Sequence, residues 1–196
     1  MDFKSSETKL NLLRAFAGES QARNRYTFAA SEAKKQGLNV IERVFTFTAG
    51  QEKEHAELFY NALKDCAGEN IEIDASYPID ISNNVVDLLK SATHNEFEEY
   101  NPIYSTFAKI AEEEGFARVS KLFSMISEIE KSHGERFDHF RELLEQGKLF
   151  KNDTETKWIC LNCGHIHSAK DAPEVCPVCE HKQGYFIRYN EFIVRA

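Results

Sequence analysis

The sequence lacks several features, and each absence argues against a class of protein. No apolar run reaches the length of about 20 residues that crosses a bilayer, and residues 1–7 are too polar for a signal peptide. A formal net charge of −8 leaves no excess of basic residues for binding nucleic acid. No glycine-rich G-x-G-x-x-G fingerprint is present, so the chain is not expected to bind a nicotinamide cofactor itself. We therefore expect a cytoplasmic protein that contacts neither membrane nor nucleic acid.

A helical pattern extends from about residue 5 to residue 150, because apolar residues recur there every three or four positions. The pattern predicts four long helices, over residues 6–36, 39–66, 83–113 and 116–146. Gly37 and Gly115 mark tight breaks within each pair of helices, whereas residues 67–82 form a long crossover between the pairs. Short–long–short connectivity is the ferritin-like arrangement of a four-helix bundle. We therefore expect an all-α ferritin-like four-helix bundle over residues 1–148.

The composition changes beyond this region, where four of the five cysteines form two C-x-x-C pairs separated by 12 residues. These are Cys160, Cys163, Cys176 and Cys179. In a cytosolic chain two such pairs indicate a tetrahedral metal site rather than disulfides, but the spacing suits zinc as well as iron. Gly164 fits the positive-φ position that such a turn often needs, and Cys66 is expected to be a free thiol. We expect a linker near residues 147–156 and a small β-ribbon metal domain over residues 149–196.

Ionisable residues occupy the middle of every helical stripe, where a buried charge needs a partner. Two E-x-x-H motifs begin at Glu52 and Glu130, and in a helix the glutamate and the histidine of such a motif share one face. One copy alone would more often be a solvated pair. Here Glu19 lies 33 residues before the first motif and Glu96 lies 34 residues before the second, so one plan is repeated twice. One glutamate from each of two helices and E-x-x-H from each of the other two is the di-iron carboxylate pattern.

Further residues on the same stripes extend this candidate site. Glu99 follows Glu96 by three positions and adds a fifth carboxylate, unless it is solvated as its neighbours are. Tyr26 and Tyr104 are placed either to hydrogen-bond a ligand carboxylate or to pack as core aromatic residues. Pro102 removes a backbone hydrogen bond from the third helix and should kink or bulge it near Glu99.

Several motifs together resemble the rubrerythrin family over nearly the whole chain. The segment AGESQARNRY, residues 17–26, resembles the first-helix signature of that family, and the later motifs follow in the family order. The run FAKIAEEEGF, residues 107–116, and the segment A-P-x-x-C-P-x-C, residues 172–179, resemble the family equally. One departure is Tyr104-Ser105, where the family usually has Tyr-Pro.

The resemblance implies a rubredoxin-like C-terminal domain with iron on the four cysteines, and hence three iron ions per chain. It implies that the di-iron ligands are Glu19, Glu52, Glu96, Glu99, Glu130, His133 and, depending on the redox state, His55. With Tyr26 and Tyr104 these residues form the expected catalytic site. The activity that the resemblance implies is reduction of hydrogen peroxide to water in oxidative stress protection. Electrons would come from NAD(P)H through a separate reductase or a rubredoxin, and the chain would form a homodimer or a larger homo-oligomer.

Two other kinds of function remain compatible with parts of the sequence. A ferritin-like iron oxidase would turn over with dioxygen and would not need the cysteine ribbon. A zinc-ribbon adaptor protein would be colourless and would leave the paired E-x-x-H motifs unexplained. Metal analysis together with a visible spectrum distinguishes these alternatives.

Overall fold

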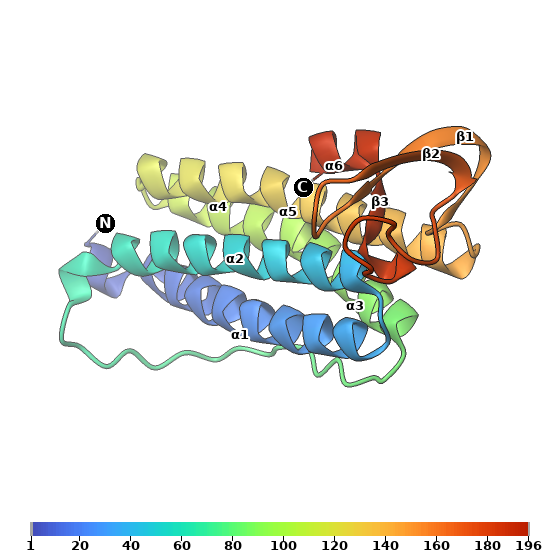
Figure 1. Cartoon of the computed structure of the whole chain (residues 1–196). Helices are drawn as coiled ribbons and strands as arrows, with labels where there is room; N and C mark the ends of the chain where they lie inside the picture. Colours follow the sequence, from blue (N-terminus) through green and yellow to red (C-terminus); the bar gives the residue numbers. More distant parts are fainter. Residues whose placement is uncertain (1, 196) are drawn as a thin grey trace.

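The computed structural model describes the backbone of residues 2–195 and the side chains as far as Phe192. Five helices build the bundle: α1 (Glu7–Lys35), α2 (Asn39–Ala62), α3 (Val85–Glu98), α4 (Ser105–Glu113) and α5 (Ala117–Glu145). Short 3-10 turns, η1 (Phe3–Ser5) and η2 (Lys64–Cys66), precede α1 and follow α2. In Figure 1, α1 and α2 form one antiparallel pair, and α3, α4 and α5 form the other. This arrangement confirms the predicted ferritin-like bundle.

The ends of the helices follow from their local sequence. The Ser6 hydroxyl caps α1 by accepting a hydrogen bond from the backbone N–H of Lys9 at 3.1 Å. The Glu114 carboxylate, at the end of α4, accepts hydrogen bonds from the backbone N–H groups of Glu7 and Thr8 at 3.0 and 2.8 Å. The turn after α1 has Gly37 at φ 73°, a left-handed conformation that glycine adopts without a steric penalty. Short turns of this kind make neighbouring helices antiparallel.

The third predicted helix is not continuous, contrary to the expectation of one helix over residues 83–113. After α3 the chain forms a π-helical segment, η3 (Glu99–Tyr104), and then resumes as α4. Asn101, which precedes Pro102, has φ −156° and ψ 120°, outside the helical region. The physical reason is Pro102, which lacks a backbone N–H and excludes the helical conformation from the residue before it. The kink expected near Glu99 is therefore present. In addition, the second predicted helix ends at Ala62 and its last residues form η2.

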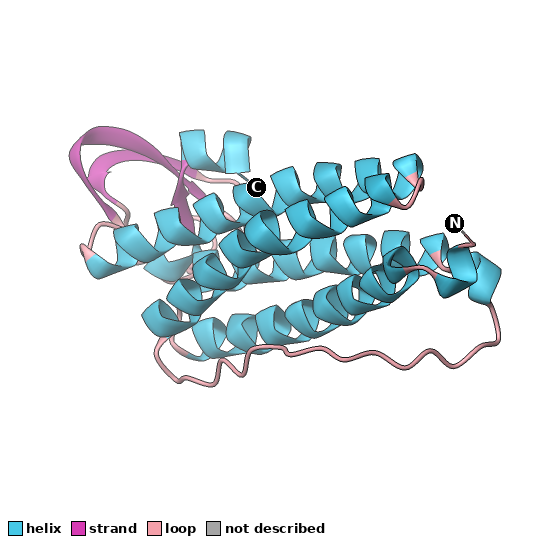
Figure 2. Ribbon diagram, turned by 180° about the vertical axis from the view of Figure 1, so that it is seen from behind, coloured by secondary structure: helices cyan, strands magenta, loops and turns pink. Residues whose placement is uncertain are grey.

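The crossover between the two helix pairs has no regular secondary structure. It leaves the end of η2 and runs along the outside of α1 to the start of α3, so it covers the side of the bundle where α1 faces the third helix (Figures 1 and 2). Asn84 closes it by capping α3, accepting a hydrogen bond from the backbone N–H of Val86 at 2.9 Å.

Two hydrophobic clusters fill the bundle on either side of its middle. One contains Phe45, Leu89 and Phe137 with residues of the ribbon, and the other contains Leu12, Phe59 and Phe123 at the opposite end. Aromatic rings pack closely in both, with Phe59 and Phe123 centroids 5.0 Å apart. The polar residues between these clusters are thus enclosed by apolar layers that exclude water.

The C-terminal ribbon is a three-stranded antiparallel sheet with the order β2-β1-β3, built from β1 (Lys151–Cys160), β2 (Ile166–Asp171) and β3 (Phe186–Arg188). A 3-10 turn, η4 (Gln183–Tyr185), and a last helix, α6 (Tyr189–Arg195), complete it. The linker expected near residues 147–156 is largely strand, because β1 already begins at Lys151. The division of the chain at residue 148 remains a prediction.

The ribbon packs directly on the bundle end where α1 turns into α2 (Figure 1). Ile159 and Ile187 belong to the same hydrophobic cluster as the bundle residues. Gly184 approaches the backbone of Gly37 so closely that a Cβ added to it would lie 1.8 Å from the Gly37 carbonyl oxygen. Arg43 of α2 donates a hydrogen bond from Nη2 to the Leu161 carbonyl at 2.8 Å, between the first two cysteines. Among the described residues, no helix is both long and apolar enough to cross a membrane.

Candidate metal centres

Two clusters of possible metal ligands lie side by side in the middle of the bundle. One consists of Glu19, Glu52, His55 and Glu130, and the other of Glu52, Glu96, Glu130 and His133. Within each cluster, one ligand atom from every residue lies within 4.8 Å of the others. The four glutamates and His133 are 0 % exposed, and His55 is 5 % exposed. The structure therefore brings together six of the seven residues that were predicted as bundle ligands.

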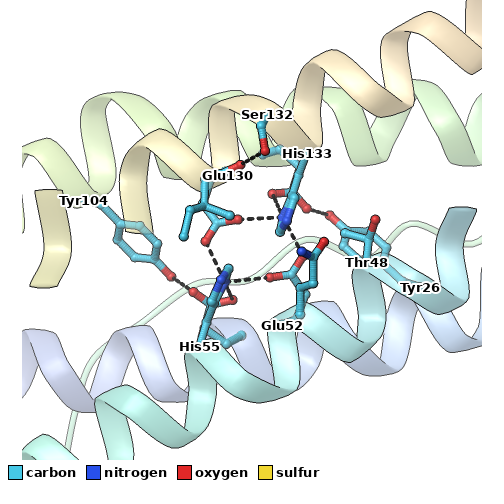
Figure 3. Close-up of polar contacts among 12 residues, drawn as sticks. Tyr26, Thr48, Glu52, His55, Tyr104, Glu130, Ser132 and His133 are labelled. Atoms are coloured by element: carbon cyan, nitrogen blue, oxygen red, sulfur yellow. Dashed lines mark hydrogen bonds and ion pairs between the residues drawn. The ribbon is translucent and has the colours of Figure 1, made fainter. Parts of the chain in front are cut away.

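Glu52 and Glu130 belong to both clusters because each directs its two carboxylate oxygens toward different histidines. For Glu130, Oε1 lies 2.9 Å from Nδ1 of His55 and Oε2 lies 2.8 Å from Nδ1 of His133. For Glu52, Oε2 lies 3.1 Å from Nδ1 of His55 and Oε1 lies 3.0 Å from Nδ1 of His133. Figure 3 shows the two carboxylates between the two imidazoles. Glu52 and Glu130 could therefore offer a ligand oxygen in both clusters, whereas Glu19 and Glu96 each belong to one cluster.

Two tyrosines hold the glutamates that belong to a single cluster. The Tyr104 hydroxyl donates a hydrogen bond to Oε1 of Glu19 at 2.5 Å, and the Tyr26 hydroxyl donates to Oε1 of Glu96. Tyr26 of α1 contacts a glutamate of α3, and Tyr104 of η3 contacts a glutamate of α1. The two tyrosines enter from opposite ends of the site (Figure 3). Both rings are 2 % exposed and pack in the hydrophobic clusters. The two roles considered for these tyrosines, carboxylate partner and core aromatic residue, are thus combined.

The site has an approximate twofold repeat with one extra residue in its second half. Glu52 and Glu130 are 78 positions apart, as are Tyr26 and Tyr104, but Glu19 and Glu96 are 77 apart. The additional residue therefore lies between Glu96 and Tyr104, where the structure has the π-helical segment η3. A π-helix contains a wider turn than an α-helix and accommodates such an insertion, frequently at functional sites. The insertion restores Tyr104 to a position equivalent to that of Tyr26.

Glu99, the seventh predicted ligand, lies at the start of η3 and belongs to neither cluster. Burial, together with the charges of Glu19, Glu96 and Glu52, raises the pKa of Glu99 well above the ordinary value. Glu99 also lines a cavity outside the clusters. In this structure the place beside Glu19 is taken by His55, whose Nδ1 lies 3.8 Å from Oε2 of Glu19. The ligand role of Glu99 remains a prediction.

The electrostatics of the site show how much positive charge it requires. Burial raises the pKa of Glu19 to about 8, and burial together with the Glu52 charge raises the pKa of Glu130 well above its ordinary value. Against the effect of burial, carboxylate partners raise the pKa of His55 to about 10 and that of His133 to about 12. The His133 charge lowers the pKa of Glu52 to about 2, although burial opposes this. Without metal, bound protons therefore balance the carboxylates.

The ligand atoms of the two clusters are better placed to coordinate metal ions than to form hydrogen bonds with one another. Buried oxygens of Glu19, Glu52, Glu96 and Glu130 and both ring nitrogens of His133 lack a hydrogen bond of acceptable geometry within the part of the chain that the structure describes. A buried polar atom without a partner is costly, and metal coordination would satisfy these atoms. Carboxylate oxygens with one imidazole per cluster suit iron or manganese. The two clusters, which share bridging carboxylates, fit a di-iron carboxylate centre.

The four ribbon cysteines form a separate cluster, with their sulfur atoms within 4.8 Å of one another. The Sγ atoms of Cys160 and Cys179 are 3.7 Å apart, as are those of Cys163 and Cys176. A tetrahedron with metal–sulfur bonds of about 2.3 Å has sulfur–sulfur edges of about 3.8 Å. The backbone N–H of His181 helps to lower the pKa of the Cys179 thiol to about 6, which favours the thiolate that binds metal.

The two cysteine turns have the same backbone conformation although their sequences differ. Gly164 has φ 77°, as expected, and donates its N–H to the Cys160 carbonyl at 2.8 Å. Glu180 occupies the equivalent position of the second turn with φ 61°, and donates to the Cys176 carbonyl at 2.9 Å. The second turn thus forms without glycine, at the steric cost that a left-handed non-glycine residue carries. Together the two centres fit three iron ions per chain.

Sequence reasoning did not identify the polar residues that support the bundle site from outside. The Asp80 carboxylate of the crossover accepts hydrogen bonds from Nη1 of Arg25 at 2.6 Å and from Nδ2 of Asn95 at 2.7 Å. Across the bundle, the Arg136 guanidinium donates to Oγ1 of Thr48 at 2.9 Å, one turn before Glu52. The available signal was position: Arg25 and Asn95 each precede a site residue, Tyr26 and Glu96, by one.

Comparison with known proteins identifies relatives for both parts of the chain. The rubrerythrin family model matches residues 11–141, and the model of the rubrerythrin rubredoxin-like domain matches residues 158–187. Rubrerythrin of Clostridium perfringens is 43 % identical over 189 residues, covering 96 % of this chain and 97 % of that protein. Rubrerythrin of Porphyromonas gingivalis is 45 % identical over 183 residues, covering 93 % of this chain and 90 % of that protein.

Among solved structures, nigerythrin in a mixed-valence state matches with a TM-score of 0.62 and 29 % identity, covering 94 % of this chain and 90 % of that one. The two family models match the bundle and then the ribbon. The first match contains the carboxylate clusters, and the second contains the cysteine cluster. The predicted resemblance is therefore confirmed: the chain belongs to the rubrerythrin family.

Proposed function

We propose that this protein is a non-haem di-iron peroxidase that reduces hydrogen peroxide to water and protects against oxidative stress. The observation that carries the proposal is the combination, in one chain, of a buried carboxylate–histidine site for two metals and a four-cysteine site for one. The first kind of site suits a two-electron reaction, and the second suits one-electron transfer. Membership in the rubrerythrin family supports the oxidoreductase assignment.

The chemistry requires two electrons and two protons for each peroxide, which becomes two molecules of water. When bound, an iron pair supplies the two electrons at the site where the O–O bond is broken. Glu52 and Glu130 would hold such a pair, because each belongs to both clusters. Since these residues are fully buried between apolar layers, the charges of the site act at low dielectric and are little screened by water.

Tyr26 and Tyr104 position the glutamates that each bind one metal. Burial, with the charges of nearby glutamates, raises the pKa of both phenols well above the ordinary value. The hydroxyl groups therefore remain protonated at neutral pH and donate to Glu96 and Glu19. These hydrogen bonds fix the orientation of the two carboxylates while the charge of the site changes during the reaction.

Glu99 and His55 are proposed as alternative ligands for the two redox states. An oxidised site carries more positive charge and favours an anionic oxygen, whereas a reduced site accepts a neutral imidazole more readily. The structure has His55 within a cluster, and Glu99 lies outside both clusters at the start of η3. The π-helical segment that carries Glu99 gives this carboxylate a backbone setting unlike that of the other ligands.

The ribbon is proposed to supply the electrons, which come from NAD(P)H through a separate reductase or a rubredoxin. Cys163 is exposed at the ribbon surface, whereas Cys160 and Cys176 are buried, so an external donor would approach from the side of Cys163. We also propose that the chain forms a homodimer or a larger homo-oligomer. Electrons could then reach the bundle site from the ribbon of the same chain or from that of a neighbouring chain.

Stopped-flow mixing of the reduced protein with hydrogen peroxide and, separately, with dioxygen tests the proposed function. We expect reoxidation by peroxide to be much faster. A faster reaction with dioxygen, accompanied by deposition of ferric oxide, would instead assign an iron oxidase. Natively purified protein that is colourless and contains only zinc would assign an adaptor.

A further inference from the structure

The bundle site is closed to solvent on nearly every side. Glu19, Glu52, Glu96 and Glu130 have no exposed surface, and the aromatic residues of both hydrophobic clusters pack above and below them. A substrate must nevertheless reach the space between the clusters. Glu99 is the predicted ligand that is partly exposed, and it lines a cavity of about 450 Å³ that opens to the surface.

This cavity lies between α1, the crossover, and the segment formed by α3, η3 and α4. Glu99 and Tyr104 form its inner wall, and Tyr104 also donates to Glu19, so the wall is continuous with the metal site. Ala15 and Gly18 line the α1 side, where their small size leaves room. The outer wall is the crossover segment Ala75–Pro78, which contains Tyr77. The cavity thus leads from solvent, past Tyr77, to the carboxyl of Glu99.

Tyr77 is held in place over this cavity. Its hydroxyl donates a hydrogen bond to the Arg14 carbonyl at 2.8 Å, and its ring lies 3.6 Å from the position that a Cβ on Gly18 would take. Tyr77 is 38 % exposed, so it lies at the mouth of the cavity that it lines. The Glu99 charge contributes, after burial, to raising the pKa of Tyr77, which places the phenol within electrostatic reach of that carboxyl.

The crossover is fastened on both sides of Tyr77. On one side, Nε of Arg14 donates to the Asp74 carbonyl at 3.0 Å. On the other side, the Asp80 carboxylate accepts hydrogen bonds from Arg25 and Asn95. The Arg25 side chain is only 13 % exposed. The segment that carries Tyr77 is therefore tied to α1 on one side and to α1 and α3 on the other.

We propose that this cavity is the access path of the oxidant to the metal site, and that Tyr77 limits the size of the hydroperoxide that passes. The inference rests on the proposed peroxidase function. Hydrogen peroxide is small and neutral, so it can pass between the Tyr77 ring and the small residues Ala15 and Gly18 of α1. An alkyl hydroperoxide carries a bulky group that the fixed ring of Tyr77 excludes. The residue is a specificity determinant rather than a catalytic residue.

Two variants change the opening in opposite directions. Tyr77→Ala removes the ring and should raise the ratio of the rate with tert-butyl hydroperoxide to the rate with hydrogen peroxide by about tenfold or more. Gly18→Leu fills the α1 side of the cavity and should slow both oxidants, the larger one more. Tyr77→Phe keeps the ring and should retain the wild-type ratio within about twofold. Ile79→Ala, at an 82 % exposed position of the same crossover, is the matched control.

A binding measurement tests the path without peroxide turnover. Association of azide with the oxidised full-length protein, followed in the visible spectrum, should be slowed by Gly18→Leu about fivefold or more and left unchanged by Ile79→Ala. Circular dichroism and the ribbon spectrum identify any variant that fails to fold. If Tyr77→Ala and Gly18→Leu leave both the hydroperoxide ratio and azide association at wild-type values, the path is elsewhere. If azide association responds but no hydroperoxide reoxidises the wild type, the proposed function fails while the path stands.

Discussion

His55 and His133 face each other across the bundle, with ring centroids 5.6 Å apart and ring planes inclined by 15°. Each presents Nδ1 to both Glu52 and Glu130. The two E-x-x-H motifs therefore form one unit rather than two separate sites, because every carboxylate in the motifs contacts both imidazoles. Removal of either motif glutamate should therefore affect both metals.

Glu52→Ala should abolish metal binding in the bundle while leaving the ribbon intact. The substitution removes a carboxylate from both clusters. Loss of a group that only supports a ligand lowers activity roughly 10- to 100-fold, so we expect the rate of peroxide reduction to fall by more than that. Iron analysis should show a loss of two metals, with the iron–thiolate absorption of the ribbon retained.

Cys160→Ser is the complementary variant, since it changes the ribbon and not the bundle. It should lose the thiolate absorption and turnover with a physiological donor. Chemically reduced Cys160→Ser protein should still reoxidise once with peroxide. Failure of that single turnover would give the ribbon a role beyond electron supply.

The metal-free protein should lose stability as the pH rises from 6 to 9. The pKa of His55 is raised in the folded state from 6.5 to about 10, so its contribution is present below pH 6.5 and is lost as the pH rises toward 10. The raised pKa of Glu19, from 4.5 to about 8, acts in the same direction because the folded state must give up a proton that it binds tightly. Thermal unfolding at several pH values measures this dependence.

Metal loading should reverse this trend. Coordination requires deprotonated ligands, so metal binding releases protons and strengthens with pH. The loaded protein should therefore gain thermal stability over the metal-free protein increasingly from pH 6 to pH 9, and loading in weak buffer should acidify the solution. A metal-free protein whose unfolding temperature is constant over this range would contradict the protonation of the cluster.

Tyr104→Phe and Tyr26→Phe should each weaken metal binding without disrupting the fold. Each removes one hydrogen bond to a buried carboxylate but retains the aromatic ring that packs in the core. Loss of such a supporting hydrogen bond typically lowers metal affinity about 10- to 100-fold. Competition with a chelator measures the change. Tyr60→Phe, at a 61 % exposed ring, should have no effect.

Gly184→Ala should loosen the ribbon from the bundle. The added Cβ would lie 1.8 Å from the Gly37 carbonyl oxygen, so the two backbones must separate. Overpacking of this kind costs about 1–3 kcal/mol, and limited proteolysis should cut near the start of β1 faster than in the wild type. Gly50→Ala in α2 is the control, because a Cβ there meets nothing within 4 Å and should stabilise the helix by up to about 1 kcal/mol. Equal proteolysis of Gly184→Ala and wild type would show that the contact does not hold the ribbon.

The sequence was sufficient to predict the bundle, the ribbon and the clustering of six of the seven candidate ligands, because each depends on local spacing. E-x-x-H places two side chains on one helix face, and the repeat near 78 residues indicates that the faces meet. The sequence also indicates the π-helical insertion, because the separation in sequence between Glu19 and Glu96 is one residue shorter than that between Tyr26 and Tyr104. Its form was not predictable, because the conformation of Asn101 depends on Pro102 and on packing together.

Contacts between distant segments left no such pattern. Nothing near Asp80 in the sequence indicates that it accepts from Arg25 and Asn95, because the crossover has no periodicity and its path depends on the folded bundle. The approach of Gly184 to Gly37 is equally invisible, since both glycines also suit ordinary turns. The access cavity therefore became apparent only from the structure.

Glu99→Gln should raise the midpoint potential of the bundle site. The substitution keeps the size of the side chain but removes an anionic oxygen, which favours the oxidised state more than the reduced one. With His55 already in a cluster, the reduced site should keep its ligands and bind Fe(II) with nearly wild-type affinity. A redox titration followed in the visible spectrum, together with Fe(II) competition, separates the two effects. Glu98→Gln is the matched control, because its side chain is 56 % exposed and the same charge is removed one residue away. An unchanged potential in Glu99→Gln, or an equal shift in Glu98→Gln, would show that Glu99 does not act as the ligand of the oxidised state, and His55 would then serve in both.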